Sequence, residues 1–310
     1  MDRGCERGPR TEVNALGLRE ERRLGRRRLI VSADDFGLSP GVNRGIVEAH
    51  EKGILTNASL MVNGAAFAEA VELARAYPRL GVGLHLVLLQ GRATLPPKEV
   101  PDLVDDRGEF PHRPVATGMR YFFLKGLRSQ LEREIRAQLE KFLATGLSLS
   151  HVDGHLNIHM HPTVLDILVR LAPEYGIRAL RLPREPLGIT LRASLWQWWR
   201  KLAEALTFRA LVAHARPKLE AAGLRSPDYM FGLHQSGRMT EEYLAAIFRR
   251  LPPGTTEVYT HASFVDEEAL RWRPRHYDCE GELRALTSPR LRVLLEGAGI
   301  ELISYAQLAA

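Results

Sequence analysis

Apolar and polar positions follow one another in a regular order of short apolar runs and longer amphipathic segments. The first apolar run, at 29–33 (LIVSA), predicts a buried strand. Ser39 and Pro40 then have the residue types of a helix N-cap and first helical position, and Gly53 that of a C-terminal stop, which predicts a helix over 41–52. Further strands are predicted at 57–62, 81–88, 147–152, 177–182, 256–259 and 301–303, and further helices at 65–76, 130–143, 161–175, 241–250 and 288–298.

This alternation of strands and helices indicates parallel βα units. About seven such units in one chain favour a single-domain α/β fold, a distorted or incomplete (β/α) barrel, over an open sheet. We expect the domain to span 28–310, preceded by a basic tail at 1–27. Two insertions are expected. One is at 90–126, where Pro, Gly and charged residues predict a long loop or irregular segment, and the other is at 185–232.

The distribution of charge matters more than its total. The net charge is +6, but residues 1–28 hold nine arginines and five acids, so the rest of the chain carries only +2. A nearly neutral body does not offer the basic patch that nucleic-acid binding needs, so we expect no nucleic-acid partner. The arginine-rich start has the composition of a disordered tail or of residues upstream of the true start codon, with contact to an anionic membrane as the alternative.

Two further features bear on the compartment. No run of 18 apolar residues predicts a membrane-spanning helix, and the first residues lack the apolar stretch of a secretory signal. Cys5 and Cys279 are the only cysteines, which is too few for a disulfide framework or a zinc-thiolate site. We therefore expect a cytoplasmic protein, with peripheral contact at the inner membrane as a further option.

Candidate catalytic and metal-binding residues lie where predicted strands end. Asp34 and Asp35 follow the first strand, His85 lies on the third, and His155 follows the strand at 147–152. In a (β/α) barrel, functional groups collect at the carboxyl ends of strands. Two adjacent carboxylates at a buried strand end are unfavourable unless a cation offsets their charge. One carboxylate and two imidazoles form a common open metal site, and the second carboxylate can accept a proton from bound water.

Taken singly, these residues also have plain structural explanations. The Asp34–Asp35 pair could cap a helix, and His85 could be hydrogen-bonded within the core. A later strand ends at His261 (EVYTHAS), which could protonate a leaving group from the side opposite Asp34 or merely cap the strand end. The combination of these residues at several strand ends favours function over the separate explanations.

The segment 151–161 (HVDGHLNIHMH) is more specific, because four of the eleven histidines of the chain fall within it. Not all four can bind one metal ion directly, and His155 is the predicted ligand. His151 and Asp153 are expected to orient the ligands. His159 is expected to do the same or to contact substrate.

Several stretches resemble the YdjC-like family, which includes chitooligosaccharide deacetylases. The matching pieces are IVSADDFGLSPGVNRGI, LTNASLMVNG, VGLHLVL, LSHVDGHLNIHMHP and EVYTHAS, which run in family order from about residue 28 to 305. The resemblance implies a distorted, TIM-barrel-like (β/α) fold. It also implies one divalent metal ion and the hydrolysis of N-acetyl groups on acetylated amino sugars.

Position by position, the resemblance assigns roles to the candidate residues. Asp35, His85 and His155 would bind the metal, which we expect to be magnesium or zinc, although manganese and cobalt also suit such a site. Asp34 would act as the general base and His261 as the general acid. The expected reaction releases acetate and leaves a free amine on the sugar.

Within the family, the likeness is greatest to members associated with hopanoid biosynthesis. It rests on HLVLLQGRATLPPKEVPDLVDDRGEF, EIRAQLEKFLATGLSLSHV, HMHPTV and YGIRALRLPREP. It implies an N-acetylglucosaminyl hopanoid, a membrane glycolipid, as substrate. The wider family resemblance matches Arg181 to a basic position expected either to contact substrate or to support the residues that do. The chain departs from the subgroup at Asn157, where many relatives have histidine, and at 153–154, where Asp-Gly replaces the common Asn-Ala.

Residues 192–218 hold three of the four tryptophans beside basic residues. Leu195, Trp199, Leu202 and Leu206 would share one face of a helix there. Such a face suits peripheral contact with a membrane, or a helix that covers the barrel and is packed by its own tryptophans. Both interpretations stay open at this point.

Three classes of function compete. A metal-dependent deacetylase is favoured, acting on the hopanoid glycolipid or alternatively on a chitooligosaccharide. The same two-histidine, one-aspartate site could serve an iron oxygenase, or a phosphoesterase if a second metal or an Arg/Lys clamp were present. A non-enzymatic assembly factor for the hopanoid pathway is the third class.

Overall fold

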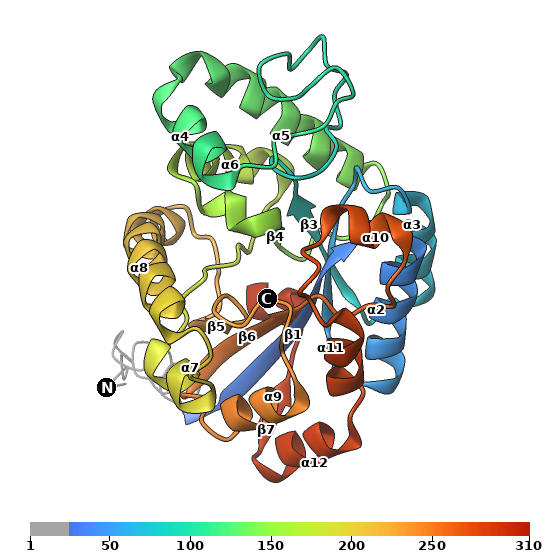
Figure 1. The fold of residues 1–310 in the computed structure, drawn as a ribbon, viewed down its shortest axis with the longest axis vertical. Coiled ribbons are helices and arrows are strands. Elements are labelled where there is room, and N and C mark those ends of the chain that lie inside the picture. The colour runs from blue at the N-terminus through green and yellow to red at the C-terminus, as the bar shows by residue number, and fades with distance from the viewer. Residues whose placement is uncertain (1–24) are drawn as a thin grey trace, which may run out of the picture.

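A computed structural model describes residues 25–310 as one α/β domain built on a curled parallel sheet (Figure 1). The sheet order is β4-β3-β2-β1-β6-β5, and β7 pairs with the beginning of β1. All of these strand pairs are parallel. The strands are β1 (Arg27–Phe36), β2 (Asn57–Leu60), β3 (Gly81–Leu86), β4 (Val152–Gly154), β5 (Tyr229–Phe231), β6 (Gly254–Thr260) and β7 (Ile300–Leu302).

Helices alternate with the strands and pack around the sheet, as Figure 1 shows. The first group is α2 (Pro40–Lys52), α3 (Phe67–Ala76), α4 (Pro114–Phe123), the short 3-10 helix η1 (Lys125–Leu127), α5 (Arg128–Leu143), the 3-10 segment η2 (His155–Met160) and α6 (Pro162–Tyr175). The second is α7 (Leu187–Ala193), α8 (Trp198–Ala221), α9 (Glu241–Phe248), α10 (Glu267–Trp272), α11 (Cys279–Leu286), α12 (Pro289–Gly297) and α13 (Tyr305–Ala309). None of the helices in the described region is both long and apolar enough to cross a membrane.

β1 lies at the centre of the sheet because its sequence suits burial on both faces. Its residues from Leu29 to Phe36 are all buried, and it pairs with β6 from Arg27 to Ala33. Near-continuous apolar runs of this kind are typical of parallel strands covered by helices. The carboxyl end of β1 therefore delivers its last residues to the middle of one edge of the sheet.

The predicted start of the first helix is confirmed, but not the way in which it ends. The side chain of Ser39 accepts a hydrogen bond from the Val42 amide at 3.3 Å, and Pro40 is the first residue of α2. Gly53 follows α2 in an extended rather than a left-handed conformation. A Cβ at Gly53 would lie 2.4 Å from the Leu286 carbonyl oxygen, so close backbone packing explains this glycine.

The predicted strand at 177–182 is wrong. Only isolated bridges form there, between Val152 and Leu180 and between Ala179 and Arg225. The neighbouring β4 has only three residues, so it offers few partners along this segment. These bridges carry the curl of the sheet beyond β4, which is consistent with a distorted barrel.

The other expectations hold in part. The strand predicted at 147–152 is displaced to β4, which begins only at Val152. The predicted insertion at 90–126 is irregular as far as residue 113 and then forms α4 and η1. The predicted insertion at 185–232 contains α7, α8 and β5. Most of the expected tail at 1–27 lies outside the described residues, and β1 already begins at Arg27.

Candidate metal centre

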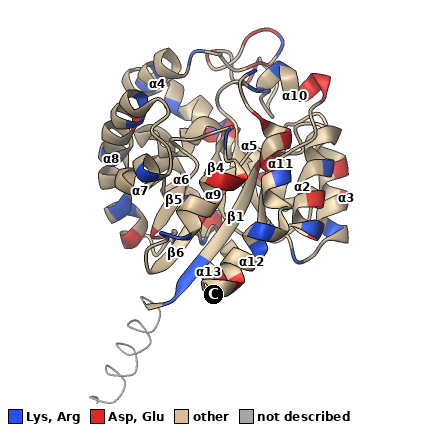
Figure 2. Cartoon of the chain, turned by 60° about the horizontal axis from the view of Figure 1, so that its bottom comes forward, with Lys and Arg blue, Asp and Glu red and all other residues tan. Residues whose placement is uncertain are grey.

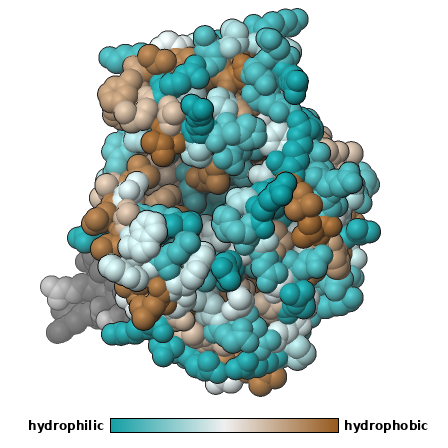
Figure 3. Space-filling view, in the orientation of Figure 1, coloured by the Kyte–Doolittle hydropathy of each residue, from teal (hydrophilic) through white to brown (hydrophobic). Residues whose placement is uncertain are grey.

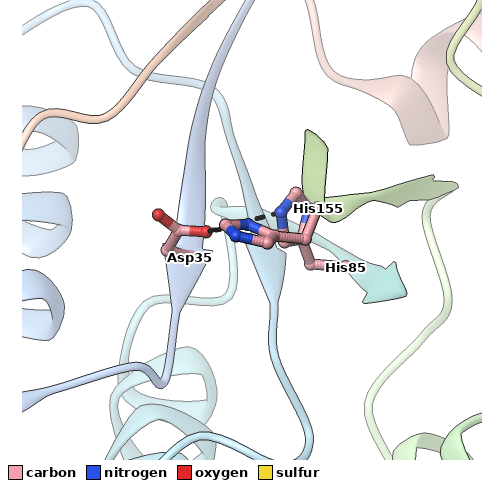
Figure 4. Close-up of side chains that lie close together, drawn as sticks. All are labelled: Asp35, His85 and His155. Atoms are coloured by element: carbon pink, nitrogen blue, oxygen red, sulfur yellow. Dashed lines mark hydrogen bonds and ion pairs between the residues drawn. The ribbon is translucent and has the colours of Figure 1, made fainter. Parts of the chain in front are cut away.

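Asp35, His85 and His155 converge at the carboxyl end of the sheet, where three separate strands deliver them (Figure 4). Asp35 Oδ1 lies 3.4 Å from His85 Nε2 and 3.2 Å from His155 Nδ1. The two imidazole rings are 5.6 Å apart and nearly perpendicular. One donor atom from each residue lies within 4.8 Å of the others, so the three side chains form a group that could hold one ion.

A local irregularity in β1 brings both aspartates into this site. Adjacent residues of a regular strand point to opposite faces of the sheet, so Asp34 and Asp35 would normally be separated. The register of β1 against β2 shifts between Ala33 and Phe36, and Asp35 has a left-handed φ of 70°. Aspartate tolerates this conformation better than most residues. Because of the bulge, both carboxylates line the same cavity.

Asp35 is fully buried, yet it remains charged because cationic and hydrogen-bonding partners surround it. Arg273 Nε donates to Asp35 Oδ2 at 2.8 Å. Burial by itself would raise the pKa of the Asp35 carboxyl. The charge of Arg273 and the hydrogen bonds from His155 and His85 outweigh burial and hold the pKa well below its usual value. A carboxylate in this state is ready to bind a cation.

His85 is held by a second buried carboxylate. Its Nδ1 lies 2.8 Å from Asp153 Oδ1, which leaves Nε2 directed at Asp35. Burial lowers the pKa of His85, but the charge of Asp153 and its hydrogen bond outweigh that effect and raise the pKa to about 10. Without a metal, the ring therefore holds a proton between the two carboxylates. A cation at Nε2 would replace that proton, as occurs at metal sites in which a carboxylate orients a histidine.

Asp34 is held in place by hydrogen bonds from Arg181. The guanidinium donates to both carboxylate oxygens of Asp34, at 2.8 and 2.9 Å. Arg181 also lies 2.8 Å from Asp153 and 2.9 Å from Glu257, and it is almost fully buried. The structure thus places Arg181 behind Asp34 and not on the cavity wall, which fits the expected support and not substrate contact. Its fixed fork orients Asp34 in one position.

His155 begins η2, a short turn with unusual backbone geometry. Leu156 and Asn157, the next two residues, have φ values of 53° and 55°. The Nε2 atom of His155 is buried and has no hydrogen-bond partner among the described residues. Strained turns of this kind cluster at functional sites. The other ring nitrogen, Nδ1, lies 3.2 Å from Asp35 Oδ1, so it is the atom of His155 placed to bind an ion together with Asp35.

The remaining histidines of the 151–161 segment serve as supports. His151 stacks on Tyr305 at 4.0 Å and lies 3.2 Å from the hydroxyl of Ser59, which donates to Asp153. His159 is fully buried, and its Nε2 lies 3.1 Å from the Arg181 carbonyl oxygen. Burial lowers the pKa of His159 to about 4, so this ring is neutral at pH 7. Of the two expectations for His159, this placement fits support and not substrate contact.

His261 faces the site from the end of β6. It lines the cavity together with Asp34 and Asp35, and its Nδ1 has no hydrogen-bond partner in the described region. Its ring packs 4.8 Å from that of Tyr277. Burial lowers the pKa of His261 to about 4 although the nearby charge of Asp35 opposes this effect, so the ring is neutral at pH 7 before substrate binds.

These residues surround a cavity of about 180 Å³ that η2 and α8 line on one side. Its inner wall is formed by the charged and histidine side chains described above. Leu156 and Phe208 form part of its outer wall, and Arg200 and Glu204 of α8 lie on the same side. A small polar group of a substrate can therefore reach the buried site while the rest of the substrate remains near the opening.

A second acidic group overlaps the first. Asp34, His85 and Asp153 also come close enough together to hold an ion. Here, however, Arg181 NH1 already lies 2.8 Å from an oxygen of each aspartate, so a guanidinium neutralises both. Between the two groups, the one formed by Asp35, His85 and His155 fits a divalent metal better, since it combines a charged oxygen with two imidazole nitrogens.

Two essential partners of the site were not predicted from the sequence. Arg273 follows α10 in the stretch RWRPRH, where nothing distinguishes it from neighbouring arginines. Glu257 lies in the middle of β6 and accepts hydrogen bonds from Ser32, Arg181 and Tyr305. It is the one charged residue of β6, and this is the signal that could have revealed it, because a buried carboxylate requires a buried cation.

The fold and this site define a class, α/β proteins whose curled parallel sheet carries a carboxylate–histidine group at its strand ends. The family model for YdjC-like proteins matches residues 28–297, and the chain belongs to this family. The chain is 35% identical over 280 residues to a carbohydrate deacetylase of Geobacillus stearothermophilus, an alignment that covers 90% of this chain and 96% of that one. It is 32% identical over 281 residues to a carbohydrate deacetylase of Brevibacillus brevis, with 91% and 99% covered.

A solved structure supports the same fold. An Enterococcus faecalis protein, provisionally described as a cellobiose-phosphate cleavage protein, superposes with a TM-score of 0.73 at 26% sequence identity. The match covers 92% of this chain and all of that one. The curled sheet and its surrounding helices are therefore shared over nearly the whole described domain.

Proposed function

We propose that this protein is a metal-dependent hydrolase that removes the N-acetyl group from an acetylated amino sugar. The observation that carries the proposal is the convergence of Asp35, His85 and His155 beside a second, separately held carboxylate, Asp34. Amide hydrolysis needs both an electrophilic cation and a base. The relatives named carbohydrate deacetylases support the substrate class.

Asp35, His85 and His155 are the residues that would hold the ion. When bound, a divalent ion supplies Lewis acidity, polarising a carbonyl and making water easier to deprotonate. Asp153 orients His85, and Arg273 keeps Asp35 ionised. The donor set suits zinc or magnesium, with affinity and supply deciding between them.

The proton transfers fall to residues of the chain itself. Asp34 takes the proton of the attacking water, while the two hydrogen bonds from Arg181 hold its carboxylate in place. His261 then protonates the departing sugar nitrogen, and the products are acetate and a free amine. Because the ring of His261 is neutral before substrate binds, it takes this proton up from solvent as negative charge develops beside it during attack, and the proton held by Asp34 is released to solvent afterwards.

The finer substrate assignment is a glycolipid, an N-acetylglucosaminyl hopanoid, with a chitooligosaccharide as the alternative. The resemblance to hopanoid-associated members favours the glycolipid. The exposed tryptophans of the 192–218 segment, which suit peripheral contact with the inner membrane, are an independent reason to prefer it. We also propose that the fold is of the distorted, TIM-barrel-like type that the resemblance to deacetylases implies.

Two rival reactions have less support. A phosphoesterase would need a second metal or a free cationic clamp, but Arg181 and Arg273 are both engaged by carboxylates. An iron oxygenase could use the same ligands, yet the base and its arginine clamp would then have no evident task. A non-enzymatic assembly role would leave the whole arrangement unused.

One experiment tests the proposal directly. The purified protein, loaded in turn with zinc and with magnesium, is incubated without oxygen with N-acetylglucosaminyl hopanoid and with diacetylchitobiose. We expect loss of one acetyl group from the glycolipid, with stoichiometric acetate, and no reaction after chelation. Turnover of the chitobiose alone would move the assignment to the oligosaccharide. Oxygen-dependent turnover, or no acetate from either compound, would overturn the proposed function.

A further inference from the structure

We infer that α4 and α8 form a docking face for an anionic lipid bilayer, which places the opening of the catalytic cavity against the membrane surface. The inference deepens the proposed function, on which its meaning for substrate delivery rests. The docking face is defined by residues 113–125, which include α4, and by residues 192–209, which include the end of α7 and the first half of α8. It extends the expected contact at 192–218 to a second helix.

Large apolar side chains are exposed on both helices instead of being packed. On α8, the side chain of Trp199 is 64% exposed and that of Leu206 is 65% exposed. On α4, Val115 is 82% exposed and Phe123 63%. Apolar side chains that share this exposure are Met119, Phe122, Leu124, Leu195, Trp196, Trp198 and Leu202. Contiguous exposure of this kind marks an interaction surface.

The structure does not support the interpretation in which tryptophans pack this helix onto the barrel. α8 is anchored by the buried residues Lys201, Ala215 and Leu219, while its tryptophans at 198 and 199 face outward. Leu195 precedes the helix, so it does not continue the predicted helical face. At the beginning of α8, therefore, it is the two tryptophan side chains that remain exposed.

One helix supports both halves of the face. The hydroxyl of Thr163, in α6, donates to the Tyr121 carbonyl oxygen of α4. Asp166, one turn further along α6, forms an ion pair with Lys218 of α8. Leu156 of η2, a segment that contacts α8, is 40% exposed and also lines the catalytic cavity. In the orientation of Figure 1, apolar side chains gather over the α4 and α8 side of the molecule, around a hollow (Figure 3).

Charge identifies the occupant. Residues 113–125 carry three basic residues and no acid, and residues 192–209 carry four basic residues and one acid. Together these two segments hold a net charge of +6, whereas all of 29–310 carries only +2, so the rest of that range is net −4. Figure 2 shows basic positions on α4, α7 and α8. An anionic surface would be attracted to this side and repelled elsewhere.

The cations on the face are also available. Arg113, Lys125, Arg192 and Arg209 make no ion pair within residues 25–310, and all four are exposed. Exposed tryptophan and phenylalanine interspersed with unpaired lysine and arginine is the composition of an interfacial membrane contact. A protein partner or a nucleic acid would account for the charge or for the aromatic residues, but a bilayer accounts for both.

The test measures vesicle binding by the full chain. Flotation with vesicles of phosphatidylcholine alone is compared with vesicles that also contain phosphatidylglycerol, at low and high salt, while tryptophan fluorescence is followed. We expect binding to the anionic vesicles, weaker binding at high salt, and a blue shift of the emission. Failure to bind anionic vesicles at low salt would overturn the inference.

Matched variants locate the contact. The double variant Phe123→Ser/Trp199→Ser removes one exposed aromatic side chain from each helix and should weaken binding at least about tenfold. Lys125→Gln/Arg192→Gln should weaken binding about tenfold to the anionic vesicles only. The control Leu270→Ser/Val293→Ser changes residues of similar exposure on α10 and α12 and should bind as the original chain does. Equal binding by all variants would refute the assigned face.

Two other outcomes would replace the bilayer. A dimer that the Phe123→Ser/Trp199→Ser change converts to monomers, with no vesicle binding, would make the face an interface between copies. Retention on a DNA duplex but not on vesicles would assign it to nucleic acid.

Acetate release from soluble diacetylchitobiose or the detergent-dispersed glycolipid measures the activity of the catalytic site independently of vesicle binding. Vesicle binding without any turnover would therefore refute the proposed function and leave the docking face standing.

Discussion

The catalytic cavity and the docking face on α4 and α8 treat charge in opposite ways. In the cavity, every ionised group described is buried against a partner, as with Asp34 on Arg181 and Asp35 on Arg273. On the docking face, four exposed cations form no ion pair within the described residues, and large apolar side chains are exposed on the same helices. The difference teaches that the cavity is built for fixed geometry, which buried pairs enforce, whereas the face is built to meet another phase.

The largest expected effect concerns the base in the cavity. Asp34→Asn removes the proton acceptor while its amide still reaches Arg181, so the fold and the metal site should survive. We expect kcat for acetate release to fall by about 10²–10⁴-fold. Metal content, measured on the purified variant, should be unchanged.

The matched control is Asp166→Asn, which changes an aspartate that pairs with Lys218 on the surface of α6. It should leave kcat close to that of the original chain. Near-normal acetate release by Asp34→Asn, with metal still bound, would show that another group accepts the proton.

The next prediction compares a buried with an exposed arginine. Arg181→Met leaves Asp34, Asp153 and Glu257 without their shared cation in the interior. We expect a loss of about 3–5 kcal/mol in the free energy of unfolding, measured with urea. Arg216→Met breaks only a surface pair with Glu220 and should cost less than about 1 kcal/mol. Equal losses would mean that the buried cluster does not hold the site rigid.

Much of the fold could be predicted because local patterns determine it. The apolar run before Asp34 predicts β1, and Ser39 with Pro40 predicts the start of α2. Where a segment depends on distant partners, the pattern fails. Residues 177–182 are apolar enough for a strand, but their neighbour β4 is too short to pair with them. Strand formation is decided by the partner as well as by the segment itself.

The same limit applies to the site. Asp35, His85 and His155 could be predicted because parallel strands end at one edge, which brings distant residues together. Arg273 could not, because its loop reaches Asp35 only after the whole chain has folded. The bulge in β1 that directs the side chains of Asp34 and Asp35 into the same cavity could not be predicted either, since the sequence DDFG does not encode the register shift against β2.

A pH prediction follows from the buried neutral histidine that supports Arg181. The folded-state pKa of His159 is about 4, below the unfolded value of 6.5, so the unfolded chain takes up more protons as the pH falls between these values. This contribution to stability is present above pH 6.5 and is lost as the pH falls towards 4. Between pH 7.5 and 4.5 it should amount to about 2–3 kcal/mol.

The variant His159→Gln isolates that contribution. Glutamine can still donate to the Arg181 carbonyl oxygen but does not titrate. Urea unfolding at the two pH values should show a smaller acid-induced loss for the variant than for the original chain. An identical loss in both would assign the acid sensitivity to other groups.

The smallest expected effect is the sharpest test of the comparison. Trp199→Ser removes a side chain that is 64% exposed, so the free energy of unfolding should change by less than about 0.5 kcal/mol. The same substitution at the buried Trp272, which is 6% exposed, should cost about 3–5 kcal/mol. A tryptophan that contributes little to the free energy of unfolding has a side chain available for contact outside the folded domain. A small change for Trp199→Ser beside a large one for Trp272→Ser would therefore support the docking face. If Trp199→Ser were as destabilising as Trp272→Ser, the beginning of α8 would belong to the core and the docking face would lose its aromatic half.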